Sequence, residues 1–313
     1  MKFMKKDTLE QSYKNQSKIF SEKTELANRL SASWFDETTA DFWLHNRMYE
    51  AVDCLKHDTS ASWVTVGDGR WGLDSIRIKK RGFQNVLPTD ICETLLLESK
   101  QKGLIDDYSV ENAEKLSFAD ESFDYVFCKE SYHHFPRPYM ALYEMLRVSS
   151  KAVFLVEPND DPLVATVNVK NFLKYKLKAF LSRNGFGHFP LFYLKNKFQN
   201  YDYESSGNYV YSLSLREMQK MAQGLNFSTI VYKGYNTHYI KGCEFELADE
   251  NKSKIFKEIK DTISFQDKRC HLGLSVYSGI MIGIYKEEID LRSKFEFEKR
   301  GWSVLNLPKN PYL

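Results

Sequence analysis

Short runs of apolar residues alternate with segments of helical periodicity through the middle of the chain. The runs are rich in β-branched and aromatic side chains, which predicts buried β-strands. Between them, apolar residues recur every three or four positions, which predicts α-helices. The predicted strands lie at 62–66, 86–90, 107–109, 125–128 and 152–156, and the predicted helices at 73–80, 92–100 and 139–148. This alternation is typical of a parallel sheet with helices on both faces.

The alternation breaks after the fifth predicted strand and returns closer to the C-terminus. No regular pattern continues through 163–212, which we interpret as an insertion, helical in its first part. Beyond it we predict a helix at 215–223, a strand at 228–232 and a long last strand within 274–286. The last two strands are expected to pair in antiparallel fashion. The prediction is an α/β domain over 57–313 with a seven-stranded, mostly parallel sheet, and a tail at 286–313 that is aromatic enough to dock.

Residues 1–56 are predicted to form a helical cap or lid ahead of the first strand. Its apolar face shows the spacing of an amphipathic helix, with Leu44, Met48, Val52 and Leu55 three or four positions apart. Asp36 is the expected N-cap of this helix. Packing does not account for Trp43, His45 and Arg47 on the same segment, so we expect one of them to contact a ligand.

Composition narrows the class of protein. The chain has 313 residues, 42% of them hydrophobic, and a formal net charge of +2, so no overall field favours nucleic acid as a partner. No apolar run is long enough to span a bilayer, and the basic start lacks the apolar run of a secretory signal. Five scattered cysteines without a C-x-x-C pair predict reduced thiols and a cytoplasmic location.

The stretch "WVTVGDGRWG" places glycines directly after the first predicted strand. Gly67 and Gly69 allow the backbone to approach a ligand closely, and the next helix points its N-terminus toward the same place. Asp90 ends the second strand about twenty residues later, where a carboxylate can accept hydrogen bonds from both hydroxyls of a ribose. This arrangement fits a dinucleotide-binding domain and an S-adenosylmethionine-binding domain equally well.

Later blocks separate these two interpretations. "NAEKLSFADESFD", "SYHHF", "ALYEMLRV" and "VFLVEP" follow in this order and resemble class I S-adenosylmethionine-dependent methyltransferases, in particular the group that includes the ubiquinone-biosynthesis enzymes. The fuller strings "VGDGRWG" and "CKESYHHFPRP" are closest to bacterial methyltransferases linked to surface-glycan genes. The resemblance covers about residues 60–160. It implies a Rossmann-like fold, S-adenosylmethionine as cofactor and S-adenosylhomocysteine as product.

The resemblance also assigns cofactor contacts to individual residues. Gly67, Asp68 and Gly69 would contact the methionine and ribose portion, Asp90 and Ile91 the ribose, Asn112, Ala113 and Glu114 the adenine, and Lys129 with Glu130 the methionine end. The chain departs from the family at Thr65, where an acidic residue is usual. Asp68 is the candidate to hold the cofactor's ammonium in its place.

Three polar residues follow the fourth and fifth strands and are candidates for the chemistry. His133 and His134 lie beyond the fourth strand, and Glu157 lies just after the fifth, at the edge where a parallel sheet binds ligands. A histidine there can act as general base while the carboxylate orients it. A purely structural role for these residues stays open, as does the choice between the two histidines. Because the histidines are adjacent, no metal site is expected.

The insertion is basic, since no acidic residue occurs from 163 to 200. Three interpretations stay open: a solvated face, a site for an anionic acceptor, or a helix that contacts anionic lipid at a membrane surface. Nucleic acid is not expected as the acceptor, and the oligomeric state is not determined.

The leading hypothesis is O-methylation of a hydroxyl on a sugar, glycan precursor or other polar small molecule. N-methylation of an amine or amino-sugar, a catalytically silent S-adenosylmethionine-binding partner protein and a nicotinamide-dependent dehydrogenase are the alternatives.

Overall fold

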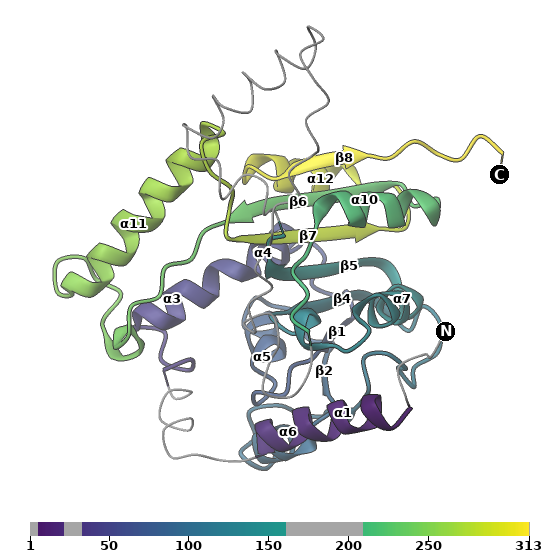
Figure 1. Ribbon diagram of the computed structural model, residues 1–313, viewed down its shortest axis with the longest axis horizontal. Coiled ribbons are helices and arrows are strands. Elements are labelled where there is room, and N and C mark those ends of the chain that lie inside the picture. The colour runs from purple at the N-terminus through teal and green to yellow at the C-terminus, as the bar shows by residue number, and fades with distance from the viewer. Residues whose placement is uncertain (1–5, 22–32, 161–208, 313) are drawn as a thin grey trace, which may run out of the picture.

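The computed structural model describes residues 6–21, 33–160 and 209–312, and its centre is an eight-stranded sheet (Figure 1). The strand order is β3-β2-β1-β4-β5-β7-β6-β8. Neighbours from β3 to β5 pair in parallel, and β7, β6 and β8 complete the sheet with antiparallel pairs. The strands are β1 (Trp63–Val66), β2 (Val86–Asp90), β3 (Ser109–Val110), β4 (Phe123–Lys129), β5 (Ser149–Pro158), β6 (Thr229–Tyr235), β7 (Gly279–Tyr285) and β8 (Ser303–Asn306).

Helices cover both faces of this sheet. The helices of the described residues are α1 (Lys6–Ser21), α3 (Ala40–Asn46), α4 (Glu50–Cys54), α5 (Leu73–Lys79), α6 (Glu93–Gln101), α7 (Pro138–Val148), α10 (Leu215–Gly224), α11 (Lys254–His271) and α12 (Leu291–Lys299), with short 3-10 turns at Arg47–Tyr49, Tyr132–His134 and Cys243–Phe245. Of these, α3 and α11 pack against each other and not on a face of the sheet. Within the described residues, no helix combines the length and apolarity needed to cross a bilayer.

Alternate residues of the central strands enter two separate cores. Trp63 of β1 and Phe154 of β5 pack with α4, α5 and α12 on one face. Val64 and Val153, their neighbours in sequence, pack with α7 and α10 on the other. All four residues of β1 are buried, and three of them are hydrophobic, while the hydroxyl of Thr65 donates to the Asp68 carboxylate. Burial of both faces explains the continuous apolar runs.

The predicted parallel core of the sheet is confirmed. The predicted antiparallel pairing of the last two strands is confirmed as well, between β6 and β7. Two predictions need correction. The sheet has eight strands and not seven, because the tail adds β8 beside β6. Thr39, and not Asp36, caps α3 by accepting the amide of Phe42. Helix α11 had no prediction. The predictions for 163–200 lie outside the described residues.

The C-terminal tail docks on the sheet through α12. Phe297 is fully buried, with its ring 6.3 Å from Phe154 and 5.0 Å from Trp302. From the same helix, Phe295 points to solvent and is 60% exposed. The tail therefore belongs to the folded core.

Replacing Phe297 with alanine is expected to lower the free energy of unfolding by about 3–5 kcal/mol, because it removes a fully buried ring and leaves a cavity. Phe295→Ala on the same helix is the matched control and should change it by less than about 1 kcal/mol. Urea unfolding followed by circular dichroism measures both. Equal effects would contradict the docking of the tail.

Candidate active site

A cavity of about 460 Å³ lies at the carboxyl ends of β1, β2 and β4. This volume falls within the range of about 300–1,000 Å³ that is usual for small-molecule sites. All nine residues predicted to bind the cofactor line this cavity. They are Gly67, Asp68, Gly69, Asp90, Ile91, Asn112, Ala113, Glu114 and Lys129. His133 and His134 line it as well, and Glu157 lies buried behind them.

The glycine turn presses the backbone against its neighbours. Gly67 has φ +77°, and a Cβ on it would lie 2.4 Å from the Cβ of Ser131, whose hydroxyl donates to the Gly67 carbonyl at 2.7 Å. A Cβ on Gly69 would lie 2.5–2.7 Å from the carboxyl atoms of Asp90. Only glycine allows this loop to reach Asp90.

Gly69→Ala is expected to weaken cofactor binding by at least about tenfold, because the new methyl group must displace the Asp90 carboxylate. Gly224→Ala at the end of α10 is the matched control, since a Cβ there meets no atom within 4 Å. Calorimetric titration with S-adenosylhomocysteine compares the two variants. Unchanged affinity in Gly69→Ala would show that the loop and Asp90 do not hold the cofactor together.

The Asp68 side chain forms hydrogen bonds within the glycine turn and with the start of α5. Its carboxylate accepts the amides of Asp74 and Ser75 at 2.9 Å each, and the Thr65 hydroxyl at 2.8 Å. Burial and the nearby Asp74 carboxylate raise the pKa of Asp68 well above its usual value. Thr65, the residue that departs from the family pattern, is thus a hydrogen-bond donor to Asp68. The Asp68 carboxylate in turn stabilises the start of α5.

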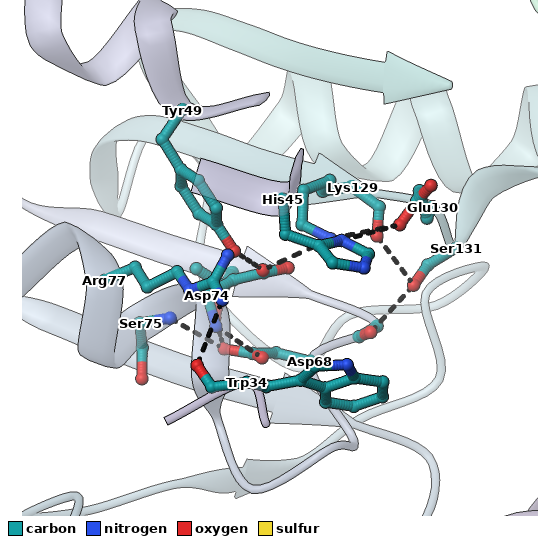
Figure 2. A network of polar contacts seen from close by, with 12 residues as sticks. Trp34, His45, Tyr49, Asp68, Asp74, Ser75, Arg77, Lys129, Glu130 and Ser131 are labelled. Atoms are coloured by element: carbon teal, nitrogen blue, oxygen red, sulfur yellow. Dashed lines mark hydrogen bonds and ion pairs between the residues drawn. The ribbon is translucent and has the colours of Figure 1, made fainter. Parts of the chain in front are cut away.

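A network of charges forms the adjacent wall (Figure 2). Buried Asp74 accepts a hydrogen bond from the Tyr49 hydroxyl and lies 3.7 Å from Lys129 Nζ. Burial disfavours the ammonium of Lys129, but Asp74, Tyr49 and Glu130 together more than compensate, so the pKa of Lys129 is raised. Lys129 therefore presents a positive charge to the cavity.

Glu130 places a negative charge next to Lys129. Its φ of +50° lies in the left-handed region, where a non-glycine residue is strained. Its carboxylate lies 3.3 Å from Lys129 Nζ and 3.7 Å from Nδ1 of His45 (Figure 2). Burial alone would raise the pKa of Glu130, but Lys129 and His45 lower it to about 2. The cavity wall therefore offers one cation and one anion side by side.

Asp90 ends β2 with its carboxyl group turned into the cavity. Its Oδ1 accepts the amide of Cys92 at 2.7 Å. Burial raises the pKa of Asp90 to about 6, although the amides of Cys92, Gly69 and Ile91 oppose this shift. The group titrates in a range where ligand binding can be followed.

Glu114 connects the predicted adenine loop to α1. Its carboxylate accepts the backbone amide of Arg137 at 2.8 Å and the Tyr13 hydroxyl at 2.7 Å, and it forms an ion pair with the Arg137 guanidinium. Tyr13 and Gln16 of α1 line the cavity. Sequence reasoning missed both residues, because no motif signals a contact with a partner 101 positions away, as Tyr13 makes with Glu114.

The side chains of Trp43, His45 and Arg47 point to different parts of the protein. His45 lines the cavity. Trp43 instead contacts Phe256 of α11, and Arg47 donates to the carbonyl of Asn236. Arg70, which sequence reasoning also missed, stacks 4.8 Å above the ring of Trp34, and both line the cavity.

His133 and Glu157 form a pair. Nδ1 of His133 lies 2.5 Å from Oε2 of Glu157, and Oε1 of Glu157 accepts the amides of Ser131 and Tyr132 at 3.0 and 2.9 Å. Because a carboxylate accepts hydrogen bonds, this contact assigns a proton to Nδ1 of His133. The centre of the His134 ring lies 3.9 Å from that of His133, so the second histidine packs against the pair.

Residues 64–156 match the family model described as a methyltransferase domain. The chain contains a methyltransferase domain. It is an S-adenosylmethionine-dependent enzyme domain, and S-adenosylmethionine is its cofactor. A comparison with curated proteins found no match.

Solved structures of methyltransferases resemble this one at low identity. A Bacillus halodurans protein described as a methyltransferase is 17% identical, with a TM-score of 0.41, and the match covers 76% of this chain and 99% of that one. Magnesium protoporphyrin IX methyltransferase from Synechocystis, with bound S-adenosylhomocysteine, is 13% identical, with a TM-score of 0.40 and coverage of 77% and 83%. An S-adenosylmethionine-dependent methyltransferase from Archaeoglobus fulgidus is 12% identical, with a TM-score of 0.42 and coverage of 72% and 86%.

Proposed function

We propose that the methyltransferase domain O-methylates a hydroxyl group on a sugar, a glycan precursor or another polar small molecule. The observation that carries this proposal is the His133–Glu157 pair at the cavity. A hydroxyl must lose its proton at or near the moment of attack, and a positioned base accelerates that step. An amine can lose its proton before attack, so N-methylation does not require such a pair.

The residues around the cavity fit S-adenosylmethionine. The Asp90 carboxylate, held against Gly69, suits the two hydroxyls of a ribose. Asn112 and Ala113 border the place for the adenine, while the carboxylate of Glu114 is engaged by Arg137. At the other end, Lys129 suits a carboxylate and Glu130 an ammonium, which are the two charges of an amino-acid moiety.

Glu130 takes over the role first considered for Asp68. The Asp68 carboxylate already accepts three hydrogen bonds from the chain, whereas Glu130 lines the cavity in its ionised form. Glu130→Gln is therefore expected to weaken S-adenosylhomocysteine binding by about tenfold, because a charge-assisted hydrogen bond becomes a neutral one. Glu121→Gln is the matched control, since Glu121 is exposed and pairs with Lys286 away from the cavity. Equal affinities of Glu130→Gln and Glu121→Gln in calorimetry would show that Glu130 does not bind the ammonium group.

The chemistry follows from what the cavity residues can do. When bound, S-adenosylmethionine supplies an activated methyl group and a leaving group. Nε2 of His133 would accept the proton of the acceptor's hydroxyl group. Glu157 holds the imidazole in its productive tautomer and stabilises the imidazolium. Lys129 and Glu130 would hold the amino-acid end of the cofactor by its two charges and so fix its position in the cavity.

The test is turnover with a cofactor that carries a labelled methyl group. Incubation with fractions of polar small molecules and glycan precursors, followed by mass spectrometry, is expected to give a labelled methyl ether. A labelled methylamine would replace the proposal with N-methylation. S-adenosylhomocysteine binding without turnover on any acceptor would favour a silent binding partner.

A further inference from the structure

We infer that the C-terminal end of α11 docks on the surface of an anionic phospholipid bilayer. We call this surface the α11 tip and define it by Phe265, Lys268, Arg269, Leu272 and Leu274. Bilayer docking at the tip goes beyond the proposed function and does not depend on it.

Three large apolar side chains of the tip face solvent. Phe265, Leu272 and Leu274 are 61%, 73% and 60% exposed. Phe265 and Leu272 are seven positions apart, so they lie on one face of the helix. The opposite face needs no partner, because Phe256, Ile259 and Ile263 of α11 already pack against α3.

The end of the helix brings Leu274 back to this face. The amide of Gly273 donates to the carbonyl of Cys270, and the amide of Leu274 donates to that of Arg269. Together with φ +67° at Gly273, these bonds form a Schellman motif, which sets Leu274 beside the last turn. The apolar cluster is therefore held in place by backbone hydrogen bonds.

Uncompensated positive charge accompanies the apolar side chains. Among the described residues, neither Lys268 nor Arg269 has a carboxylate within ion-pairing distance, and the Arg269 guanidinium lies 5.8 Å from the centre of the Phe265 ring. The nearest acid in sequence, Asp267, accepts a hydrogen bond from Asn236 at 2.8 Å. Exposed Phe and Leu side chains flanked by Lys and Arg match an anionic bilayer surface, which takes up the apolar groups and attracts the cations.

The position of α11 relates the tip to the active site. Figure 1 shows α3 and α11 together beyond one end of the strands of the sheet. His45 of α3 lines the cofactor cavity, while Trp43 of the same helix lines a groove shared with Leu272 of the tip. A bilayer bound at the tip would therefore lie on the side of the protein that carries the cavity.

Co-sedimentation with vesicles tests the inference on the full chain. We expect binding to vesicles of phosphatidylcholine and phosphatidylglycerol at about three to one, and at least about tenfold weaker binding to phosphatidylcholine alone. Lys268→Gln with Arg269→Gln should weaken binding to the mixed vesicles by about thirtyfold. Leu272→Glu with Leu274→Glu should reduce it by at least about tenfold.

Leu291→Glu is the matched control. Leu291 is 85% exposed on α12, so this change also adds a charge at an exposed leucine but leaves the tip intact. It should bind vesicles like the unaltered protein. Absence of binding by the unaltered protein, or equal binding by the tip variants, would overturn the inference.

Two further measurements distinguish bilayer docking from a dimer contact and from an effect on the active site. Concentration-dependent dimerisation in light scattering that Leu272→Glu abolishes would assign the tip to a second copy of the chain and overturn the inference. Calorimetry with S-adenosylhomocysteine should give the same affinity for the tip variants and the unaltered protein. Absence of this affinity in the unaltered protein would count against the proposed function, and vesicle binding would still decide the role of the tip.

Discussion

His133→Ala is expected to lower kcat for a hydroxyl acceptor by about 10²–10⁴-fold, because it removes the group that accepts the proton. KM and the affinity for S-adenosylhomocysteine should change little, since the imidazole acts on the acceptor in the transition state. In the unaltered enzyme, kcat should rise with pH and then level off, because a protonated imidazole cannot accept a proton. This rise should disappear in His133→Ala. Steady-state kinetics at several pH values measures both effects.

Two further variants distinguish base catalysis from a structural role. Glu157→Gln keeps its shape and one acceptor oxygen but loses the charge that stabilises the imidazolium, so kcat should fall by about 10–10³-fold and the pH profile should shift. His134→Ala, which leaves the His133–Glu157 pair in place, is the matched control and should lose less than about tenfold. Equal losses for both histidines, with an unchanged pH profile, would favour positioning alone.

Asp90→Asn is expected to weaken S-adenosylhomocysteine binding by about 100-fold at pH 7, because two charge-assisted hydrogen bonds to the ribose are lost or weakened. The unaltered protein should bind more weakly below pH 6, because the Asp90 pKa is about 6 and the ligand requires the carboxylate. Binding depresses this pKa and releases a proton, so the affinity rises with pH up to about 6 and then levels off. In Asp90→Asn the affinity should not vary between about pH 5 and 7. Calorimetric titration at several pH values measures both effects.

Asp107→Asn is the matched control for this experiment, because Asp107 is exposed, pairs with Lys100 and lies outside the cavity. It should bind like the unaltered protein at every pH. Without ligand, the raised pKa means that ionisation of Asp90 costs folding stability as the pH rises above about 4. Ligand-free Asp90→Asn should therefore melt no earlier than the unaltered protein at pH 7. A large loss of thermal stability would show that Asp90 supports the fold and not the ligand.

Much of the site could be predicted because parallel strands end at the same edge. β4 and β5 are neighbours in the sheet, so His133 beyond the end of β4 and Glu157, the second-last residue of β5, come within hydrogen-bond distance. For the same reason Asp90, at the end of β2, meets the glycine turn after β1. These contacts join residues that are 20 or more positions apart in the sequence. They can be predicted because the order of the strands in the sheet determines which strand ends are neighbours.

Other contacts could not be predicted, because they depend on side chains that meet without a repeating pattern. Tyr13 reaches Glu114 only once α1 lies over the loop that carries Glu114. The Asp68 carboxylate turns to the amides of Asp74 and Ser75, a choice that the spacing of the glycine motif does not reveal. Short, polar β8 has too few apolar residues to be recognised, and its pairing with β6 depends on α12 packing beneath the sheet.

The sequence by itself determined the strand–helix alternation, the glycine turn and the polar residues at the ends of the strands. It could do so because hydrophobic period and glycine position are local properties that each segment carries alone. Only the tertiary structure decided which histidine meets Glu157, that Asp74 holds Lys129 charged and that Glu130 lies between Lys129 and His45. Those outcomes depend on burial and on distances between charges, which exist only after distant segments have packed together.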